Sequence, residues 1–166
     1  VHVEGGVVAR SAVRIATRQP RPSSIPKGAS WVHVDLGEQV LTAYEGDRQV
    51  FATLIATGKP KTPTKPGLFT ILAKTAHSDM RGLPPEEYFV EEVPGVIHFY
   101  RGQAFHGTYW HDGFGVVHSH GCINMSVADI EWLLRWAPPT LPDGWHTVLA
   151  RDLRRTGLYV LVQRRG

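Results

Sequence analysis

The residues with the clearest chemical potential lie in the run from His118 to Asn124, HSHGCIN in one-letter code. This run contains Cys122, the only cysteine of the 166 residues, and His106 lies upstream of it. A thiolate is a strong nucleophile, and a nearby imidazole can generate it by removing the thiol proton. The pattern therefore indicates a cysteine acyl-transfer site, with His106, His118 or His120 as the candidate base.

Two other interpretations of these residues are weaker. A lone cysteine can be a small buried hydrophobe, but its polar neighbours and the adjacent Gly121 argue against that role here. Five histidines lie between positions 98 and 120, and with Cys122 they raise the question of a zinc site. Zinc usually takes four ligands at characteristic spacings, and these spacings match no familiar pattern. We therefore expect no metal and no other cofactor.

Composition and charge limit the remaining possibilities. The chain is 42% hydrophobic and 20% charged, which is ordinary for one globular domain of this length. No apolar run is long enough to cross a bilayer, so we expect no membrane span. The net charge is only +3, and the arginines gather near both ends without interleaved aromatic residues. We therefore expect no nucleic-acid partner.

The pattern after residue 30 predicts mainly β-structure. Short turns separate three predicted strands, which together indicate an antiparallel meander: 31–36, 39–44 and 48–57. Further strands are expected at 68–72, 96–100, 104–106, 146–150 and 157–163. Residues 76–87, with several polar and proline residues, predict an irregular excursion long enough to cover a cleft.

One helix is predicted directly after the cysteine. Ser126 is an N-cap residue, and Asp129 occupies the position of a capping-box partner. Apolar residues recur on one face as far as Ala137, and two prolines then end the run. Cys122 therefore precedes a helix N-terminus, whose positive dipole favours a thiolate. The amides of Gly121 and Cys122 are candidates for binding an oxyanion.

The first 30 residues predict a separate extension or arm. Residues 1–18 show short β-like alternation, and residues 19–30 contain three prolines and a glycine, which is typical of a linker or an arm packed on a surface. We expect residues 1–30 to be the tail of a preceding segment or a cap on the main domain, and residues 31–166 to form the catalytic domain.

Three segments together resemble the signature of the YkuD-type L,D-transpeptidases, the cysteine enzymes that cross-link peptidoglycan. They are Ser119–Asn124 (SHGCIN), the upstream pair His106-Gly107, and Thr62–Ile71 (TPTKPGLFTI). The resemblance extends over residues 31–163. It implies a mostly β fold, an L,D-transpeptidase-type β-sandwich in which one main helix follows the catalytic cysteine loop.

The same resemblance implies catalytic roles. Cys122 is the expected nucleophile and His106 the general base, with the Gly107 carbonyl orienting the imidazole. The amides of His120, Gly121 and Cys122 are expected to form the oxyanion hole.

The resemblance and the neighbouring residues also suggest substrate contacts. Ser119 and His120 are expected to shape the pocket, and Asn124 to hold the loop or touch substrate. Tyr109 and Trp110 closely follow the base and are candidate cleft walls. Within the Thr62–Ile71 segment, the extra Lys65-Pro66 departs from the family pattern. The resemblance therefore does not predict the conformation of the loop beside the cleft.

The implied reaction is acyl transfer in two steps. The enzyme takes the acyl group of a diamino acid in a tetrapeptide stem, releases the terminal D-alanine, and passes the acyl group to an amine. Stem peptides, and an anchored protein as acceptor, are the expected partners, and the expected location is the periplasm or cell wall of a bacterium. Two alternatives remain: a hydrolase in which water replaces the amine, and a non-catalytic peptidoglycan-binding module, which would lack Cys122 or His106.

Overall fold

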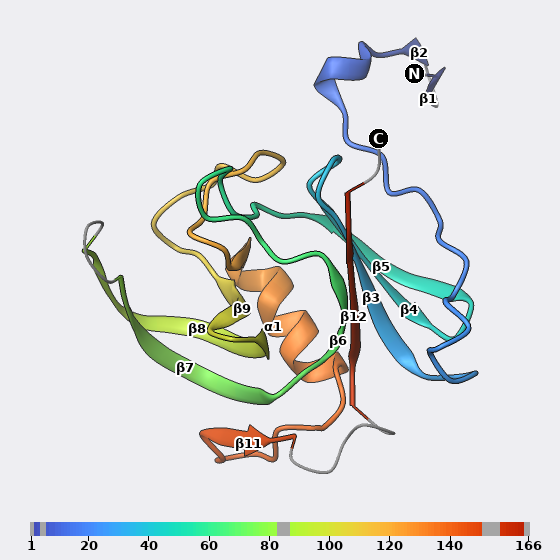
Figure 1. The fold of residues 1–166 in the computed structure, drawn as a ribbon. Coiled ribbons are helices and arrows are strands. Elements are labelled where there is room, and N and C mark those ends of the chain that lie inside the picture. Colours follow the sequence, from blue (N-terminus) through green and yellow to red (C-terminus); the bar gives the residue numbers. More distant parts are fainter. Residues whose placement is uncertain (1, 4–5, 83–86, 151–156, 165–166) are drawn as a thin grey trace.

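The computed structural model describes residues 2–3, 6–82, 87–150 and 157–164. Two five-stranded sheets and one α-helix make up the main body, and the helix lies between the sheets (Figure 1). This arrangement confirms the prediction of a mostly β sandwich with one main helix after the cysteine loop. In the described residues, no helix is both long and apolar enough to span a bilayer.

The first sheet has the strand order β5-β4-β3-β12-β6. Its strands are β3 Ser30–Asp35, β4 Val40–Glu45, β5 Arg48–Leu54, β6 Gly67–Thr70 and β12 Tyr159–Gln163. β3, β4 and β5 pair antiparallel in sequence order, so the predicted meander is confirmed. β12 returns from the C-terminal part of the chain and pairs parallel to β3 and antiparallel to β6.

The second sheet has the order β10-β9-β8-β7-β11 and contributes most of the site. Its strands are β7 Ala73–Arg81, β8 Phe89–Tyr100, β9 Gln103–Gly107, β10 Ile123–Met125 and β11 Thr147–Leu149. β7, β8 and β9 form an antiparallel run, whereas β10 lies parallel to β9. The parallel pair requires a long crossover, and residues 108–122 provide it.

Helix α1 spans Val127–Trp136 and completes the core. The Ser126 side chain accepts a hydrogen bond from the Asp129 amide at 3.1 Å, as the N-cap prediction requires. The Asp129 carboxylate does not complete a capping box, because it accepts a 2.6 Å hydrogen bond from the Thr53 hydroxyl of β5 instead. Ile130 and Leu133 are fully buried in a cluster that includes residues of both sheets, so the helix ties the layers together.

The prediction of an irregular segment at 76–87 is wrong for its first part. β7 continues to Arg81, with Ser78 beside Val93 and Met80 beside Val90 of β8. The polar residues misled the prediction because a two-stranded ribbon is held by main-chain hydrogen bonds, which tolerate exposed polar side chains. Residues 83–86 lie outside the described part of the chain.

The N-terminal residues form a short hairpin, a single helical turn and an extended arm. The hairpin strands are β1 His2–Val3 and β2 Gly6–Val7, and a 3₁₀ turn, η1, spans Arg10–Ala12. Ile25 of the arm is fully buried in a cluster with Trp31 and Tyr44, on the face of the first sheet away from the helix. Residues 19–30 thus cover this face, and the domain boundary at residue 30 stays a prediction.

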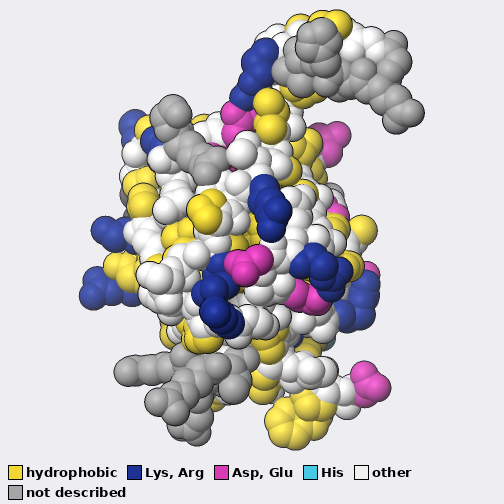
Figure 2. All heavy atoms as spheres, turned by 90° about the vertical axis from the view of Figure 1, so that its right-hand side faces the viewer, with side chains coloured by type: hydrophobic (Ala, Val, Ile, Leu, Met, Phe, Trp, Pro, Cys, Tyr) yellow, Lys and Arg dark blue, Asp and Glu magenta, His cyan; other side chains and the backbone are white. Residues whose placement is uncertain are grey.

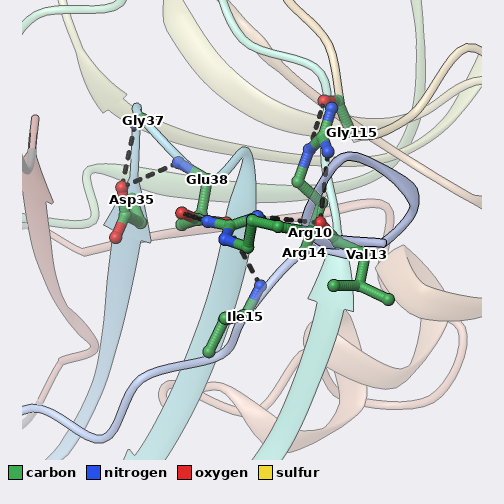
Figure 3. Close-up of polar contacts among 8 residues, drawn as sticks. All are labelled: Arg10, Val13, Arg14, Ile15, Asp35, Gly37, Glu38 and Gly115. Atoms are coloured by element: carbon green, nitrogen blue, oxygen red, sulfur yellow. Dashed lines mark hydrogen bonds and ion pairs between the residues drawn. The ribbon is translucent and has the colours of Figure 1, made fainter. Parts of the chain in front are cut away.

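Polar contacts fix the beginning of the arm (Figure 3). Arg10 forms an ion pair with Glu38 in the turn between β3 and β4, and the Ile15 amide donates to the same carboxylate at 3.2 Å. Arg14 donates to the Gly115 carbonyl at 3.0 Å, in the crossover between β9 and β10. In the middle of the face in Figure 2, Asp and Glu side chains lie among the Lys and Arg side chains.

Candidate active site

A cleft of about 360 Å³ opens beside the cysteine loop. Twelve described residues line it: Lys59, Met80, Tyr88, Val90, Gly102, His106, Trp110, His118, Ser119, His120, Cys122 and Asn124. They come from four parts of the chain: the segment after β5, the β7–β8 hairpin, the stretch from the β8–β9 turn through β9 and the crossover, and β10. The cleft is therefore lined by both Cys122 and His106, the predicted nucleophile and base.

Strand alternation places the thiol and the imidazole on one face. β9 and β10 run parallel, with Phe105 beside Ile123 and His106 beside Asn124. Phe105 and Ile123 are fully buried in the core, so the alternate residues face the opposite side of the sheet. His106, Asn124 and Cys122 accordingly line the cleft together.

The His106 ring is held in a defined orientation and kept dry. Only 4% of the residue is exposed, and Nδ1 lies 3.0 Å from the carbonyl oxygen of Gly107. A carbonyl can only accept, so the proton of the neutral ring is on Nδ1 and Nε2 is left free to take one. Burial lowers the pKa of His106 to about 4, although the Gly107 carbonyl opposes that shift. The imidazole is therefore neutral, and able to act as a base, at neutral pH.

The Cys122 thiol lies in apolar surroundings. It is partly buried and packs against a cluster of Val93, Val96 and Ala104. Burial raises the pKa of Cys122, while the Ala104 main chain partly offsets this. The expectation that a helix dipole favours the thiolate is wrong, because β10 separates Cys122 from the helix that begins at Val127. The thiol donates to the Gly102 carbonyl at 3.8 Å, so at rest the cleft holds a neutral thiol and a neutral imidazole.

The cysteine loop is stabilised by its own side chains. The Ser119 hydroxyl accepts from the Gly121 amide at 3.1 Å and donates to the Cys122 carbonyl. Gly121 has φ +120°, a conformation that other residues rarely adopt, and a Cβ there would lie 2.9 Å from the Gln103 side chain. The Gly121 amide is engaged within the loop, so of the amides expected to bind an oxyanion, that of Cys122 is the better candidate.

A neighbouring segment holds this loop through main-chain hydrogen bonds. The amides of His118 and Ser119 donate to the Thr57 carbonyl at 2.9 and 3.0 Å. Ala56 and Asn124 exchange both main-chain hydrogen bonds, at 3.0 and 2.9 Å. The segment that follows β5 therefore holds the nucleophile loop in place through main-chain hydrogen bonds.

Asn124 links the nucleophile strand to the crossover. Its side chain is buried, and its amide nitrogen lies 2.9 Å from Nε2 of His111. Nδ1 of His111 accepts from the Gly113 amide at 3.2 Å, and the ring packs 4.1 Å from that of His118. Among the residues that the structure describes, no three His, Cys, Asp or Glu side chains are grouped so that they could hold a metal ion.

The two aromatic candidates differ in position. Trp110 lines the cleft and stacks on the His106 ring, with centroids 5.9 Å apart and planes at 22°. Tyr109 does not line it: its hydroxyl donates to the Glu91 carbonyl of β8 at 2.7 Å, and its ring meets Trp110 edge-on. Trp110 is 41% exposed, so it is a wall of the cleft and no part of the core.

Sequence reasoning missed several lining residues. Met80, Tyr88 and Val90 reach the cleft from the β7–β8 hairpin, and Tyr88 stacks on His120 with centroids 5.4 Å apart. Length and polarity predicted that this region covers a cleft, but gave no sign of which side chains face inward. Lys59 was also missed, although it follows Thr57-Gly58 and closely precedes the Thr62–Ile71 segment of the family resemblance.

Several solved structures have a similar fold. An L,D-transpeptidase from Mycobacterium smegmatis is 26% identical with a TM-score of 0.65, covering 81% of this chain and 58% of that one. A mutant L,D-transpeptidase from Enterococcus faecium is 24% identical with a TM-score of 0.65, covering 82% and 50%. L,D-transpeptidase 3 from Mycobacterium tuberculosis, in complex with a faropenem-derived adduct, is 22% identical with a TM-score of 0.65, covering 82% and 60%.

These likenesses concern part of larger proteins. The chain spans between half and three fifths of the length of the solved structures just named. Among curated protein sequences, none is significantly similar to this chain. The family model of the L,D-transpeptidase catalytic domain, named YkuD, matches residues 29–148, which is well over half of the chain. The chain therefore belongs to the YkuD family of L,D-transpeptidase catalytic domains.

Proposed function

We propose that this domain is a cysteine-dependent L,D-transpeptidase acting on peptidoglycan stem peptides. Cys122 takes the acyl group of the diamino acid in a tetrapeptide stem, D-alanine leaves, and an amine accepts the acyl group. The observation that carries the proposal is the placement of the Cys122 thiol and the buried, neutral His106 imidazole on one face of the same cleft. Such a protein works outside the cytoplasm of a bacterium, at its cell wall.

The first half of the reaction forms a thioester. Nε2 of His106 takes the thiol proton as the sulfur of Cys122 attacks the carbonyl carbon of the scissile amide. The carbonyl oxygen becomes an oxyanion, and we assign the Cys122 amide as its main-chain donor. When the tetrahedral adduct collapses, the carbon–nitrogen bond breaks and the departing D-alanine amine takes the proton from His106. The products are the acyl-enzyme and free D-alanine.

The second half consumes the thioester. A side-chain amine of a second stem, or of an anchored protein, attacks the acyl carbon while His106 removes its proton. The carbon–sulfur bond breaks, and His106 returns the proton to the sulfur, which restores the resting pair. Because the imidazole is neutral at the start of each half, it serves as base and then as acid without any change in the bulk pH.

Incubation with purified muropeptides tests this function. We expect the enzyme to release D-alanine and to form a dimer whose mass equals two stems minus one D-alanine, as detected by mass spectrometry. Release of D-alanine without any dimer or protein adduct would instead identify a hydrolase with the same site. Binding to peptidoglycan with neither product would identify a non-catalytic module.

Trp110→Ala is expected to shift the acyl-enzyme from amine transfer toward hydrolysis. Trp110 covers the His106 ring, so its loss admits water beside the thioester. The ratio of hydrolysed to cross-linked product should rise severalfold while the rate of Cys122 acylation stays within a few-fold. The same exposure to water should move the pKa of His106 upward, because burial is what lowers it.

The matched control is Trp145→Ala, since Trp145 is 60% exposed and does not line the cleft. Loss of a fully buried tryptophan costs about 3–5 kcal/mol, and an exposed one costs less. Both variants should therefore lower the melting temperature by only a few degrees, at about 2–4 °C per kcal/mol. A large fall in stability of the Trp110 variant with an unchanged product ratio would contradict the role of Trp110 as a water shield.

A further inference from the structure

Lys59 is the charged side chain of the cleft. Of the twelve described lining residues, it alone carries an ammonium or guanidinium group, and none carries a carboxylate. In the described part of the chain, no carboxylate forms an ion pair with Lys59. The other lining groups are imidazoles, the hydroxyls of Ser119 and Tyr88, an amide, a thiol and apolar or aromatic surface. The cleft therefore presents one sign of charge to whatever enters it.

The main chain holds Lys59 against the nucleophile loop. Its amide donates to the Ser119 carbonyl at 3.0 Å, and its own carbonyl accepts from the Thr62 amide at 3.0 Å. Gly58 before it pairs with Ser119, and a Cβ on Gly58 would lie 2.1 Å from the Thr62 carbonyl oxygen, so only glycine allows this close approach. The main chain at Lys59 is thus held in place, and only the side chain is left to move.

Further hydrogen bonds connect the same segment to both sides of the loop. The Thr64 hydroxyl donates to the Gly121 carbonyl at 2.9 Å, directly before the nucleophile, and accepts from the Gly58 amide at 2.9 Å. Gln103 of β9 accepts from the Lys65 amide at 3.0 Å and donates to the Pro63 carbonyl at 3.1 Å. The position of Lys59 is therefore coupled to that of the thiol.

We propose that Lys59 determines specificity by binding a carboxylate that the acyl donor carries close to its scissile carbonyl. This inference rests on the proposed function, because that function sets the donor as a stem peptide. An ammonium without a carboxylate partner in its own cleft gains a charge-assisted hydrogen bond only when the ligand brings the anion. Two donor groups have this chemistry: the terminal D-alanine carboxylate, and a second carboxylate on the diamino acid.

The test compares three donors that differ only in these groups: the free acid, its C-terminal amide, and the amide of the diamino-acid carboxylate. The value of kcat/KM for D-alanine (or D-alaninamide) release is measured for the wild type, Lys59→Met, Lys59→Arg and Lys61→Met. Lys61 is a matched control, because it is an exposed lysine two residues away that does not line the cleft. Neutral iodoacetamide, followed by intact mass, reports whether Cys122 stays reactive in each variant.

We expect the wild type and Lys61→Met to prefer the free acid over one of the two amides by about tenfold, the size of one charge-assisted hydrogen bond. Lys59→Met should lose that preference, mainly through KM, and Lys59→Arg should keep it. The preference of the wild type should also shrink as salt is added, since the group is exposed. The amide that the wild type uses less well shows which of the two donor carboxylates binds Lys59.

Two results would overturn the inference. If Lys59→Met keeps the wild-type ratios of kcat/KM between donors, or the wild type prefers none of the donors, Lys59 does not bind a donor carboxylate. The transpeptidase function would still stand. If no donor releases its terminal residue with any of the four proteins while Cys122 still reacts with iodoacetamide, the proposed function fails, and this inference fails with it.

Discussion

Cys122→Ala is expected to abolish covalent acylation completely. A carbapenem ring opened by a thiol leaves an acyl-thioester, which is chemically analogous to the proposed acyl-enzyme. The wild-type protein should gain the mass of one drug molecule, and Cys122→Ala should gain none. Intact-mass measurement after treatment gives the result directly, because the chain has only one cysteine.

The loss should not reflect unfolding. Cys122 is partly buried and sits at the edge of its apolar cluster, so replacing it with alanine removes little packing. The melting temperature should therefore change by a few degrees at most. An adduct that persists on Cys122→Ala, at full occupancy, would show that another side chain is the nucleophile and would remove the basis of the proposed function.

His106→Gln is expected to slow acylation of Cys122 by about 10²–10⁴-fold, the usual contribution of a general base. Glutamine has a similar size but cannot take a proton from the thiol, which has a raised pKa and is not ionised at rest. The rate constant is measured from the time course of adduct mass. His98→Gln is the matched control, because His98 is a partly buried β8 histidine that does not line the cleft.

His120→Ala separates two of the three candidate bases, His106 and His120. We expect a smaller loss than for His106→Gln, since His120 stacks on Tyr88 as part of the cleft wall. Near-normal acylation by His106→Gln, together with loss of acylation by a folded His120→Ala, would reverse the two assignments. Thermal melts of each variant separate loss of chemistry from loss of fold.

The pH dependence of acylation provides an independent check on His106. Burial lowers the pKa of His106 to about 4 and raises that of Cys122, so the neutral pair dominates over a broad range between these values. The rate should stay level from about pH 5.5 to pH 8 and should fall only as His106 is protonated near pH 4. An acidic limb near 6.5, the ordinary value for histidine, would show that the base is not the buried ring.

Local patterns predicted much of the fold for identifiable reasons. The meander of β3, β4 and β5 follows from alternating strands and tight turns, both of which act over a few residues. The start of α1 follows from Ser126, whose side chain binds the Asp129 amide within one turn. The polar ribbon at β7 was missed, because its strand pairing with β8 is a main-chain property that side-chain polarity does not reveal.

The sequence by itself determined the family, the single thiol and a short choice of histidines, because these depend on residue identity and spacing. Only the tertiary structure determined which side chains line the cleft together and how deeply each is buried. The parallel pairing of β9 and β10 places His106 and Cys122 on one face, and burial then favours the neutral form of each. The cleft wall from Tyr88 and the position of Lys59 likewise depend on contacts between distant segments. Burial and proximity are properties of the packed chain, so no local pattern could express them.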